Sequence, residues 1–295
     1  MLKKIDTPLG HWILLISLSI VWGSSFILIK RGLDTFSFEQ VASLRLFLAF
    51  IFLAFIGRKH YSSVPKNKLW PLFLTGIIGN GIPAFIFTKS GTFLDSGLIG
   101  ILNVLTPLFT LFIGLFFYKL KVKLVNYIGV GIGIIGTLYL LFPDIHDVNE
   151  KTLLYILLVL VATACYGLSS NIIKTHLHDL NSIQITTIAF SFLGPWAGIY
   201  LFNTNFIELM QTHPKAWSSF GYISILALIG TAISVIVFNK LIKMTGALFA
   251  TSCTYIIPIV AILWGVLDGE QITLHHLSGF LIILGGVYLV NKRAS

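Results

Sequence analysis

GLIGILNVLTPLFTLFIGLFFY, residues 97–118, carries no charge and is long enough to cross a bilayer as a helix, which takes about 20 apolar residues. Pro107 near its middle cannot donate a backbone hydrogen bond, and it frees a carbonyl one turn earlier. Such a break is tolerated at membrane depth where protein or a watered cavity satisfies the backbone. Residues 246–267 carry Pro258 at the corresponding point. Paired proline-interrupted segments indicate a transporter binding site, and we expect both prolines to act as hinges.

The composition is that of an integral membrane protein. Of the 295 residues, 56% are hydrophobic and 11% are charged, and the mean hydropathy is +0.91, outside the range of soluble globular domains. The apolar runs are continuous, unlike the roughly ten-residue alternation of β-barrel strands. We therefore predict an all-α integral membrane fold with ten transmembrane helices and no appended catalytic domain. The runs are residues 11–30, 38–57, 69–89, 95–118, 124–142, 152–174, 182–202, 216–240, 245–267 and 273–291.

Basic residues are unevenly divided between the two ends of these helices. With a cytoplasmic N-terminus, fourteen of the 20 Lys and Arg residues fall on the cytoplasmic side and five on the other, where nine of the eleven acidic residues also fall. This asymmetry predicts that both termini are cytoplasmic, and we expect a bacterial inner membrane protein. The net charge of +9 is thereby explained without a nucleic-acid partner. Lys3 and Lys4 imitate a signal peptide, but the run after them is too long and lacks a cleavage site, so we keep it as the first helix.

The second half of the chain repeats motifs of the first. WGSSFILIK at 22–30 matches YGLSSNIIK at 166–174 with four identities in nine positions, an offset of 144 residues. GIIGNGIPAFIFTK at 76–89 matches ALIGTAISVIVFNK at 227–240 with an offset of 151, which the two prolines share. Recurrence at a fixed spacing is typical of a tandem repeat.

We therefore predict two five-helix repeats, residues 1–146 and 147–295. Because five is odd, the second copy enters the bilayer from the opposite face. The repeats are then inverted, related by an axis in the membrane plane. A site between them can open alternately to either side of the membrane.

Arg45 is a charge inside a predicted helix. Only 12 residues separate it from Arg58, too few to span a bilayer, so Arg45 lies within the membrane or close to its edge. An ionisable residue there costs about 2.5 to 3.5 kcal/mol on insertion scales and normally faces the protein interior. In one interpretation it clamps carbonyls or pairs with Glu39 or Asp34. In the other it attracts a carboxylate or phosphate of the substrate.

Four lysines end predicted helices and match in pairs across the repeat: Lys30, Lys89, Lys174 and Lys240. Helix-terminal lysines ordinarily snorkel to the interface and anchor the helix. The alternative is that they steer anionic groups of the substrate toward a cavity.

Polar residues at membrane depth gather in the first, third, fourth, sixth, eighth and ninth predicted helices. Serine and threonine often bond their own backbone, but an asparagine amide needs partners that lipid cannot supply. A cavity lined by aromatic, amide and hydroxyl groups suits a small amphipathic or zwitterionic solute. The candidate substrate-binding residues are Trp22, Ser25, Arg45, Asn80, Asn103, Thr106, Tyr166, Ser169, Asn171, Asn239 and Tyr255.

Several kinds of chemistry lack the residues that they need. No Asp or Glu lies near the centre of a run and all eight histidines lie at ends or in loops, so a proton relay has no carrier and Ser169 and Ser170 have no base. There is no Walker motif for ATP. Cys165 and Cys253 show neither metal nor disulfide spacing. We expect no enzyme activity, no metal and no cofactor.

Gly131, Gly133 and Gly136 spell the G-x-G-x-x-G pattern of dinucleotide-binding folds. No strand precedes them and they lie inside an apolar run, so the match is false. Small residues at three- and four-residue spacing allow helices to approach closely. Gly285 and Gly286 repeat the theme in the last run, and we expect both helices to be peripheral packing elements.

The motifs and their order resemble the drug/metabolite transporter superfamily, EamA type. The resemblance rests on WGSSF at 22–26, the arginine in ASLRLFLAFIFL at 42–53, the Pro107 helix, GIGIIGTLYLL at 131–141 and the five-plus-five organisation. It covers essentially the whole chain and implies ten helices in two inverted repeats, cytoplasmic termini, and often export of amino acids or other small metabolites. Tyr166 replaces Trp22 and Ala189 falls where Arg45 would, so a family substrate cannot be carried over.

Three functions remain to be compared. The first is a secondary carrier that moves a small metabolite, such as an amino acid or related amphipathic solute, across the plasma membrane by alternating access, in the direction of export. The second is a carrier of phosphorylated metabolites or lipid-linked intermediates. The third is a membrane enzyme or assembly factor. The expected partners are a small-molecule substrate and the lipid bilayer, and the oligomeric state is left open.

Overall fold

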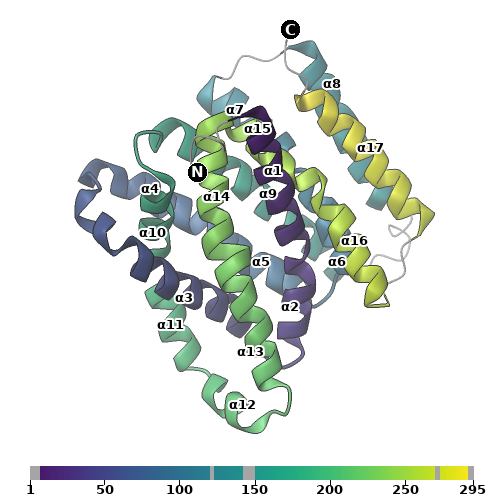
Figure 1. Ribbon diagram of the computed structural model, residues 1–295. Helices are drawn as coiled ribbons and strands as arrows, with labels where there is room; N and C mark the ends of the chain where they lie inside the picture. Colours follow the sequence, from purple (N-terminus) through teal and green to yellow (C-terminus); the bar gives the residue numbers. More distant parts are fainter. Residues whose placement is uncertain (1–6, 120–122, 142–149, 270–272, 292–295) are drawn as a thin grey trace.

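The computed structural model describes residues 7–119, 123–141, 150–269 and 273–291, and each regular element in these ranges is a helix. The helices form one bundle, and α1 begins at the same end of it at which α17 finishes (Figure 1). The first half contains α1 (Pro8–Gly23), α2 (Ser25–Leu33), α3 (Phe38–Gly57), η2 (Arg58–Ser63), η3 (Lys66–Lys68), α4 (Leu69–Gly76), η4 (Ile77–Gly81), α5 (Ile82–Ser90), α6 (Ser96–Asn103), α7 (Thr106–Tyr118) and α8 (Leu124–Leu141). The second half contains α9 (Glu150–His176), α10 (Ser182–Ser191), α11 (Gly194–Phe202), α12 (Phe206–Thr212), α13 (Ala216–Ile225), η6 (Leu226–Ile233), α14 (Ser234–Thr245), α15 (Ala247–Thr251), η7 (Ser252–Tyr255), α16 (Ile257–Leu267) and α17 (Leu274–Asn291).

Within the described ranges, eight helical stretches are long and apolar enough to cross a membrane. This confirms the all-α membrane class. The runs predicted at 124–142 and 273–291 form α8 and α17, whose apolar portions, Leu124–Gly136 and Leu277–Gly286, are shorter than the other eight. The count of ten spanning helices in two repeats therefore stays a prediction. The eight stretches are Pro8–Leu33, Phe38–Ser63, Lys66–Ser90, Ser96–Tyr118, Glu150–His176, Ser182–Phe202, Ala216–Thr245 and Ala247–Leu267.

Both prolines lie where a helix restarts after a break. Pro107 occupies the first turn of α7, directly after the interruption that ends α6 at Asn103. Pro258 occupies the first turn of α16, after the 3₁₀ turn η7. Proline suits these positions because the first turn of a helix needs no backbone donor there. The predicted breaks are confirmed, whereas hinge motion at them stays a prediction.

The helices α3 and α10 begin with the same kind of N-terminal cap. Ser37 and Gln40 form a capping box at the start of α3, and Asn181 and Gln184 form one at the start of α10. In such a box two backbone N–H groups that lack helical partners are satisfied reciprocally.

The glutamine of each capping box also donates a hydrogen bond to the far end of the other helical segment. Gln40 Nε2 donates to Thr204 Oγ1 at 3.0 Å and to Asn205 Oδ1 at 2.9 Å, just beyond the end of α11. Gln184 Nε2 donates to Ser63 Oγ at 2.9 Å, just beyond the end of α3. The start of each segment therefore lies at the end of the other, so α3 and α10–α11 run antiparallel.

The helices α8 and α17 also pack antiparallel, at one side of the bundle (Figure 1). A Cβ added to Gly286 would lie 2.5 Å from Gly133 N, so the two backbones touch at the two glycines. Asn126 Nδ2, near the start of α8, donates to Leu289 O at 3.4 Å near the end of α17. Close packing is thus confirmed for Gly133 and Gly286, whereas Gly131 and Gly285 face no neighbour within 4 Å.

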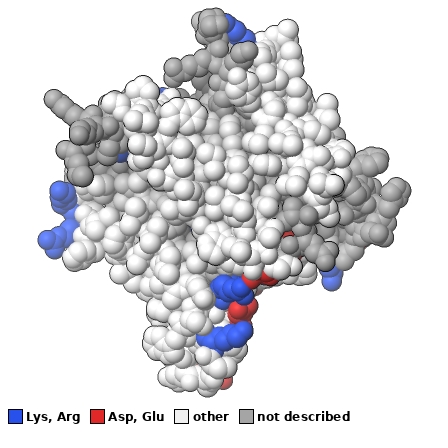
Figure 2. Space-filling view, turned by 45° about the vertical axis from the view of Figure 1, so that its right-hand side comes forward, with Lys and Arg blue, Asp and Glu red and all other residues white. Residues whose placement is uncertain are grey.

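Asp268, at the end of α16, joins that helix to α2. Its carboxylate pairs with Lys30 Nζ at 2.6 Å and with the Arg31 guanidinium. Asp34 lies 4.0 Å from both Arg31 and Lys215. Figure 2 shows acidic and basic side chains gathered together at this end, below a broad uncharged area in the middle of the face. We call it the Asp268 end, and the opposite end, where Lys68 pairs with Asp179 at 2.9 Å, the Asp179 end.

The Asp268 ion pairs are expected to make stability depend on pH. The hydrogen bond from Lys30, with Arg31 nearby, holds the pKa of the Asp268 carboxyl below its ordinary value of 3.8. Because the pKa is lower in the folded chain than in the unfolded chain, this stabilisation is fully present above pH 3.8 and is lost as the pH falls through the lowered value.

We expect Asp268→Asn to lower the free energy of unfolding by about 1 kcal/mol near neutral pH, the upper range for exposed ion pairs. The difference from the native chain should vanish in acid, and thermal unfolding in detergent from pH 7 to pH 3 measures it. Glu208→Gln removes the same charge from an exposed residue of α12 and should change little. A gap of constant size across the whole pH range would contradict the assignment.

Candidate functional site

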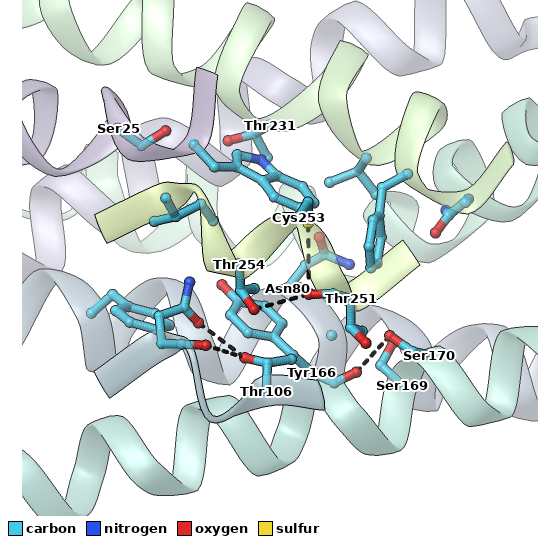
Figure 3. Close-up of a pocket in the computed structure, with 18 of the residues that line it drawn as sticks. Ser25, Asn80, Thr106, Tyr166, Ser169, Ser170, Thr231, Thr251, Cys253 and Thr254 are labelled. Atoms are coloured by element: carbon cyan, nitrogen blue, oxygen red, sulfur yellow. Dashed lines mark hydrogen bonds between the residues drawn. The ribbon is translucent and has the colours of Figure 1, made fainter. Parts of the chain in front are cut away.

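A cavity lies among the two half-helices α1 and α2, the helices α3 and α9, and the interrupted segments around η4, η6 and η7. It holds about 980 Å³ of space not filled by atoms, including the part open to solvent. Figure 3 shows its labelled side chains, which come from several helices and surround a common space. Nine of the eleven predicted binding residues line it: Trp22, Ser25, Arg45, Asn80, Asn103, Thr106, Tyr166, Ser169 and Asn239.

The other two predicted binding residues lie outside the cavity. Asn171 is buried between α9 and α7, where its Nδ2 donates to Thr110 O and Gly167 O, both at 2.9 Å. Tyr255, in η7, packs against the apolar cluster that includes Leu108. Their positions suit a structural role. Pro107 and Pro258 also lie outside the lining, next to the lining residues Thr106 and Ile257.

The remaining lining residues were not among the eleven candidates for substrate binding, although Ser170, Thr231 and Thr254 are polar residues at membrane depth. The remaining residues are Phe26, Ile29, Leu46, Thr75, Gly79, Phe87, Ser170, Ile173, Thr231, Val235, Phe238, Thr251, Cys253, Thr254 and Ile257. Many of them are repeat partners of other lining residues. With the offset of 144 residues the lining pairs are Trp22 with Tyr166, Ser25 with Ser169, Phe26 with Ser170 and Ile29 with Ile173. With the offset of 151 they are Asn80 with Thr231, Phe87 with Phe238, Asn103 with Thr254 and Thr106 with Ile257.

The repeat offsets were the signal that could have found these residues. Applied to Asn80, the offset of 151 leads to Thr231, and applied to Asn103 it leads to Thr254. Arg45 breaks the pattern, because its counterpart, Ala189, is not a lining residue. Sixteen of the 24 lining residues form such pairs, so the lining is symmetric in part and asymmetric in charge.

Two π-helical segments shape the walls. Gly79 and Asn80 belong to η4, and Thr231 belongs to η6. A π-helical turn inserts one extra residue into the helix and is frequent at functional sites. In η6, Thr231 Oγ1 donates to Leu226 O at 3.0 Å and accepts from Arg45 Nε at 2.7 Å. The widened turn thus supplies the partner that fixes the Arg45 side chain.

Aromatic pairs make up much of the remaining wall. The Trp22 and Phe238 rings meet edge to face with centroids 5.1 Å apart, and Trp22 Nε1 donates to Gly230 O at 2.9 Å. Phe87 stacks on Tyr166 with centroids 5.7 Å apart. Such contacts hold the rings in place and leave apolar surface toward the cavity.

The break between α6 and α7 contributes a fixed polar group. Thr106 Oγ1 donates to Asn103 O at 2.8 Å and lies 3.1 Å from Asn103 Oδ1 (Figure 3). The Asn103 amide is thereby held at the cavity by its own helix end. Asn239 Nδ2, on the opposite half, donates to Thr186 Oγ1 at 3.0 Å.

The cavity is bordered differently at its two ends. Toward the Asp179 end, a tightly buried cluster that includes Leu177, Leu180 and Leu241 packs beneath Trp22 and Phe238. Toward the Asp268 end, a second cavity of about 590 Å³ shares Phe26, Ile29 and Phe87 with the first and is also lined by Lys30 and Asp95. Phe26, Ile29 and Phe87 therefore lie between the two cavities.

Residues 10–142 and residues 153–292 each match the sequence model of the EamA-like transporter family. The chain belongs to this family. Among its curated relatives are an uncharacterized transporter of Bacillus subtilis, YoaV, at 24% identity with 93% of this chain and 94% of the relative covered, and an uncharacterized inner membrane transporter of Escherichia coli K12, YedA, at 25% identity with 94% and 89% covered. A Salmonella typhimurium relative, 24% identical with 92% and 91% covered, is named a probable amino-acid metabolite efflux pump.

The fold of this EamA-like chain is similar to one seen in a crystal structure. That solved chain aligns with a TM-score of 0.65 at 12% identity, and 97% of each chain is covered. At this identity the likeness shows the fold alone. Together with the family match and the relatives, it makes the chain a multi-pass membrane protein of a transporter family.

The site of this EamA-like chain is suited to binding. Among the described residues that line the cavity, Arg45 is the single charged side chain, and there is no histidine or carboxylate to act as a base for Ser169 or Ser170. The alternative in which Arg45 pairs with Glu39 or Asp34 has no contact to support it in the described ranges, where Arg45 Nε donates to Thr231 Oγ1 and Glu39 Oε2 accepts from Ser37 Oγ at 2.8 Å.

The three helix-end lysines with an observed contact lie outside the main cavity. Lys30 pairs with Asp268. Lys89 Nζ lies 5.0 Å from the centroid of the Phe38 ring, and Lys174 Nζ donates to Lys243 O at 3.5 Å. These contacts are those expected of anchoring side chains. None of the four lysines lines the main cavity.

Proposed function

We propose that the chain is a secondary transporter that exports a small amphipathic metabolite, such as an amino acid or a related compound, across the plasma membrane by alternating access. The observation that carries this proposal is the cavity whose lining residues come in equivalent pairs from the two halves of the chain. A binding site on an axis between two equivalent halves can be exposed to either side by the same relative motion.

The antiparallel arrangement of equivalent helices supports the inverted repeat on which this mechanism depends. The boxes that cap α3 and α10 each bond to the far end of the opposite segment. The last helices of the two halves, α8 and α17, meet at Gly133 and Gly286 and run in opposite directions. An inverted pair of five-helix units, residues 1–146 and 147–295, requires these orientations.

The proposed direction, export, follows the Salmonella typhimurium relative that is named an efflux pump. With both termini in the cytoplasm, the Asp179 end is the cytoplasmic end, because it carries the larger share of lysine and arginine. In that orientation the cluster around Leu177 lies between the cavity and the cytoplasm, and the second cavity lies on the outer side. We infer that this conformation is closed to the cytoplasm, a state that an exporter passes through when it releases its substrate.

The competing enzyme function has less support. It would require an acid, a base or metal ligands at the site, and the lining residues within the described ranges offer one arginine and otherwise uncharged side chains. In the same ranges, His, Cys, Asp and Glu residues form no group of three that could hold a metal ion.

Counterflow in proteoliposomes tests the proposed function. Vesicles that contain the purified chain are loaded with an unlabelled solute and diluted into a trace of the same solute in labelled form. The panel should contain amino acids, sugars, sugar phosphates and cationic drugs. We expect transient accumulation of label for at least one amino acid or related solute, and none in vesicles without protein. Rates equal to those of protein-free vesicles across the whole panel would refute the transporter.

A further inference from the structure

The Arg45 guanidinium is a charged group for which the fold supplies only part of the partners that it needs. Its Nε donates to Thr231 Oγ1 at 2.7 Å. Within the described ranges no hydrogen bond or ion pair reaches Nη1 or Nη2. A guanidinium carries five N–H donors in a planar fork that matches a carboxylate in a bidentate way. Four of these donors are on the two Nη atoms, so they are left for another group.

The position of this fork is set by the protein. Thr231 is itself held by the hydrogen bond from its Oγ1 to Leu226 O in the π-helical segment η6. Arg45 comes from α3 in the first half of the chain, and Thr231 comes from the second. The side chain is therefore fixed between the halves before any solute arrives, and a fixed donor loses little freedom when it binds.

The charge of the cavity selects for one negative charge. Arg45 is the single charged residue among the described lining residues, so a solute without an anionic group leaves the guanidinium uncompensated. A phosphate dianion would carry one charge more than the cavity can balance. Lys30, which lines the second cavity, is already paired with Asp268.

The remaining wall fits an apolar body. The stacked rings of Phe87 and Tyr166 line the same cavity as Arg45, and Tyr166 is close enough to Arg45 to interact with it electrostatically. The wall also contains Trp22 and Phe238. A solute whose carboxylate lies on Arg45 would therefore place its body among aromatic rings.

We infer that Arg45 is the carboxylate-binding group of the transport site, and that the substrate class is a monocarboxylate with an apolar or aromatic body. This inference rests on the proposed function. Asn103 and Asn80 are the lining amides available to further polar groups of the same solute.

The test compares solutes that share a phenyl ring and differ in charge, and the first two have the same shape. The probes are N-acetyl-L-phenylalanine, a monocarboxylate, its neutral carboxamide, the cation L-phenylalaninamide, and the dianion phenyl phosphate. Binding is measured by calorimetry on the purified chain in lipid nanodiscs. We expect the carboxylate to bind at least about tenfold more tightly than the carboxamide, the range for a hydrogen bond to a charged group.

Variants assign this preference to Arg45. Arg45→Gln should bind the carboxylate and the carboxamide equally, while Arg45→Lys should retain part of the preference. Lys89→Gln removes the same charge outside the cavity, where Lys89 contacts Phe38, and should keep the full preference. If the Arg45 variants fail to fold, the comparison of probes on the native chain still decides.

Several outcomes would overturn the inference. They are equal binding of carboxylate and carboxamide by the native chain, tighter binding of phenyl phosphate, no carboxylate binding at millimolar concentration, or an unchanged preference in Arg45→Gln. Counterflow measured on the same preparations distinguishes failure of this inference from failure of the proposed function. Counterflow of neutral or cationic solutes without a carboxylate preference would support the transporter and reject the carboxylate site. Binding of the carboxylate without counterflow of any solute would support the carboxylate site and reject the transporter.

Discussion

Gly167→Leu is expected to unfold the chain at a much lower temperature than the native protein, because α9 and α7 touch at this glycine. A Cβ at position 167 would lie 2.7 Å from Thr110 N and 2.9 Å from Phe109 C. These are backbone atoms, so relief requires α7 to move as a unit. One turn further along α9, Asn171 Nδ2 bonds to Thr110 O and would be pulled away with it.

The loss of stability can be measured more readily with alanine at position 167, which is a smaller change than leucine. Gly167→Ala should lower the free energy of unfolding by about 1 to 3 kcal/mol, the range for overpacked cores, and leucine should lower it further. Thermal unfolding in detergent, followed by circular dichroism, measures both. Gly221→Ala in α13 is the matched control, since its Cβ would meet no atom within 4 Å. It should be neutral or stabilising by up to about 1 kcal/mol, because alanine favours a helix. Equal unfolding temperatures for the two alanine variants would contradict the contact.

Gly79→Leu is expected to reduce counterflow to less than a tenth of the native rate while leaving the chain folded. Gly79 lines the cavity in η4, and a Cβ there would press on the Ser169 side chain, 2.9 Å from Ser169 Cβ. The Ser169 hydroxyl can turn aside, whereas Ser169 Cβ requires a small shift of α9, and the rest of the leucine side chain should then occupy cavity space. The substrate and the leucine then compete for one volume.

The control for this blockade is a leucine of equal size outside the cavity. Gly131→Leu in α8 meets no heavy atom within 4 Å of its Cβ and lies on an exposed surface. It should transport at the native rate. Native counterflow by Gly79→Leu, in a preparation that unfolds at the native temperature, would show that the cavity is not the route.

The sequence predicted the helices well because their physical basis is simple. A run of about 20 apolar residues must satisfy its backbone internally, and Pro107 and Pro258 cannot continue a helix. The π-helical segments η4 and η6 were not predicted, because an extra residue in a helix that is apolar on most faces leaves no periodic signal.

Part of the site could also be predicted from the sequence on simple physical grounds. Polar side chains in an apolar segment must face protein, so Asn80 and Asn103 could be placed inside the bundle from the sequence. What the sequence does not contain is which helix each one meets. Asn171 faces protein as expected, but the carbonyl beside it belongs to Thr110 of α7 and not to the cavity. Tyr255 lies in a 3₁₀ turn, which rotates it away from the face that an α-helix would give it.

The absence of a carboxylate among the described lining residues also bears on what drives transport. Arg45 stays with the protein through a complete cycle, so in the proposed export of a monocarboxylate each solute molecule that leaves the cell would transfer one net negative charge. An inside-negative membrane voltage favours that exit by about 2.3 kcal/mol per 100 mV. Voltage alone would then drive net efflux, without a proton or sodium ion travelling with the solute.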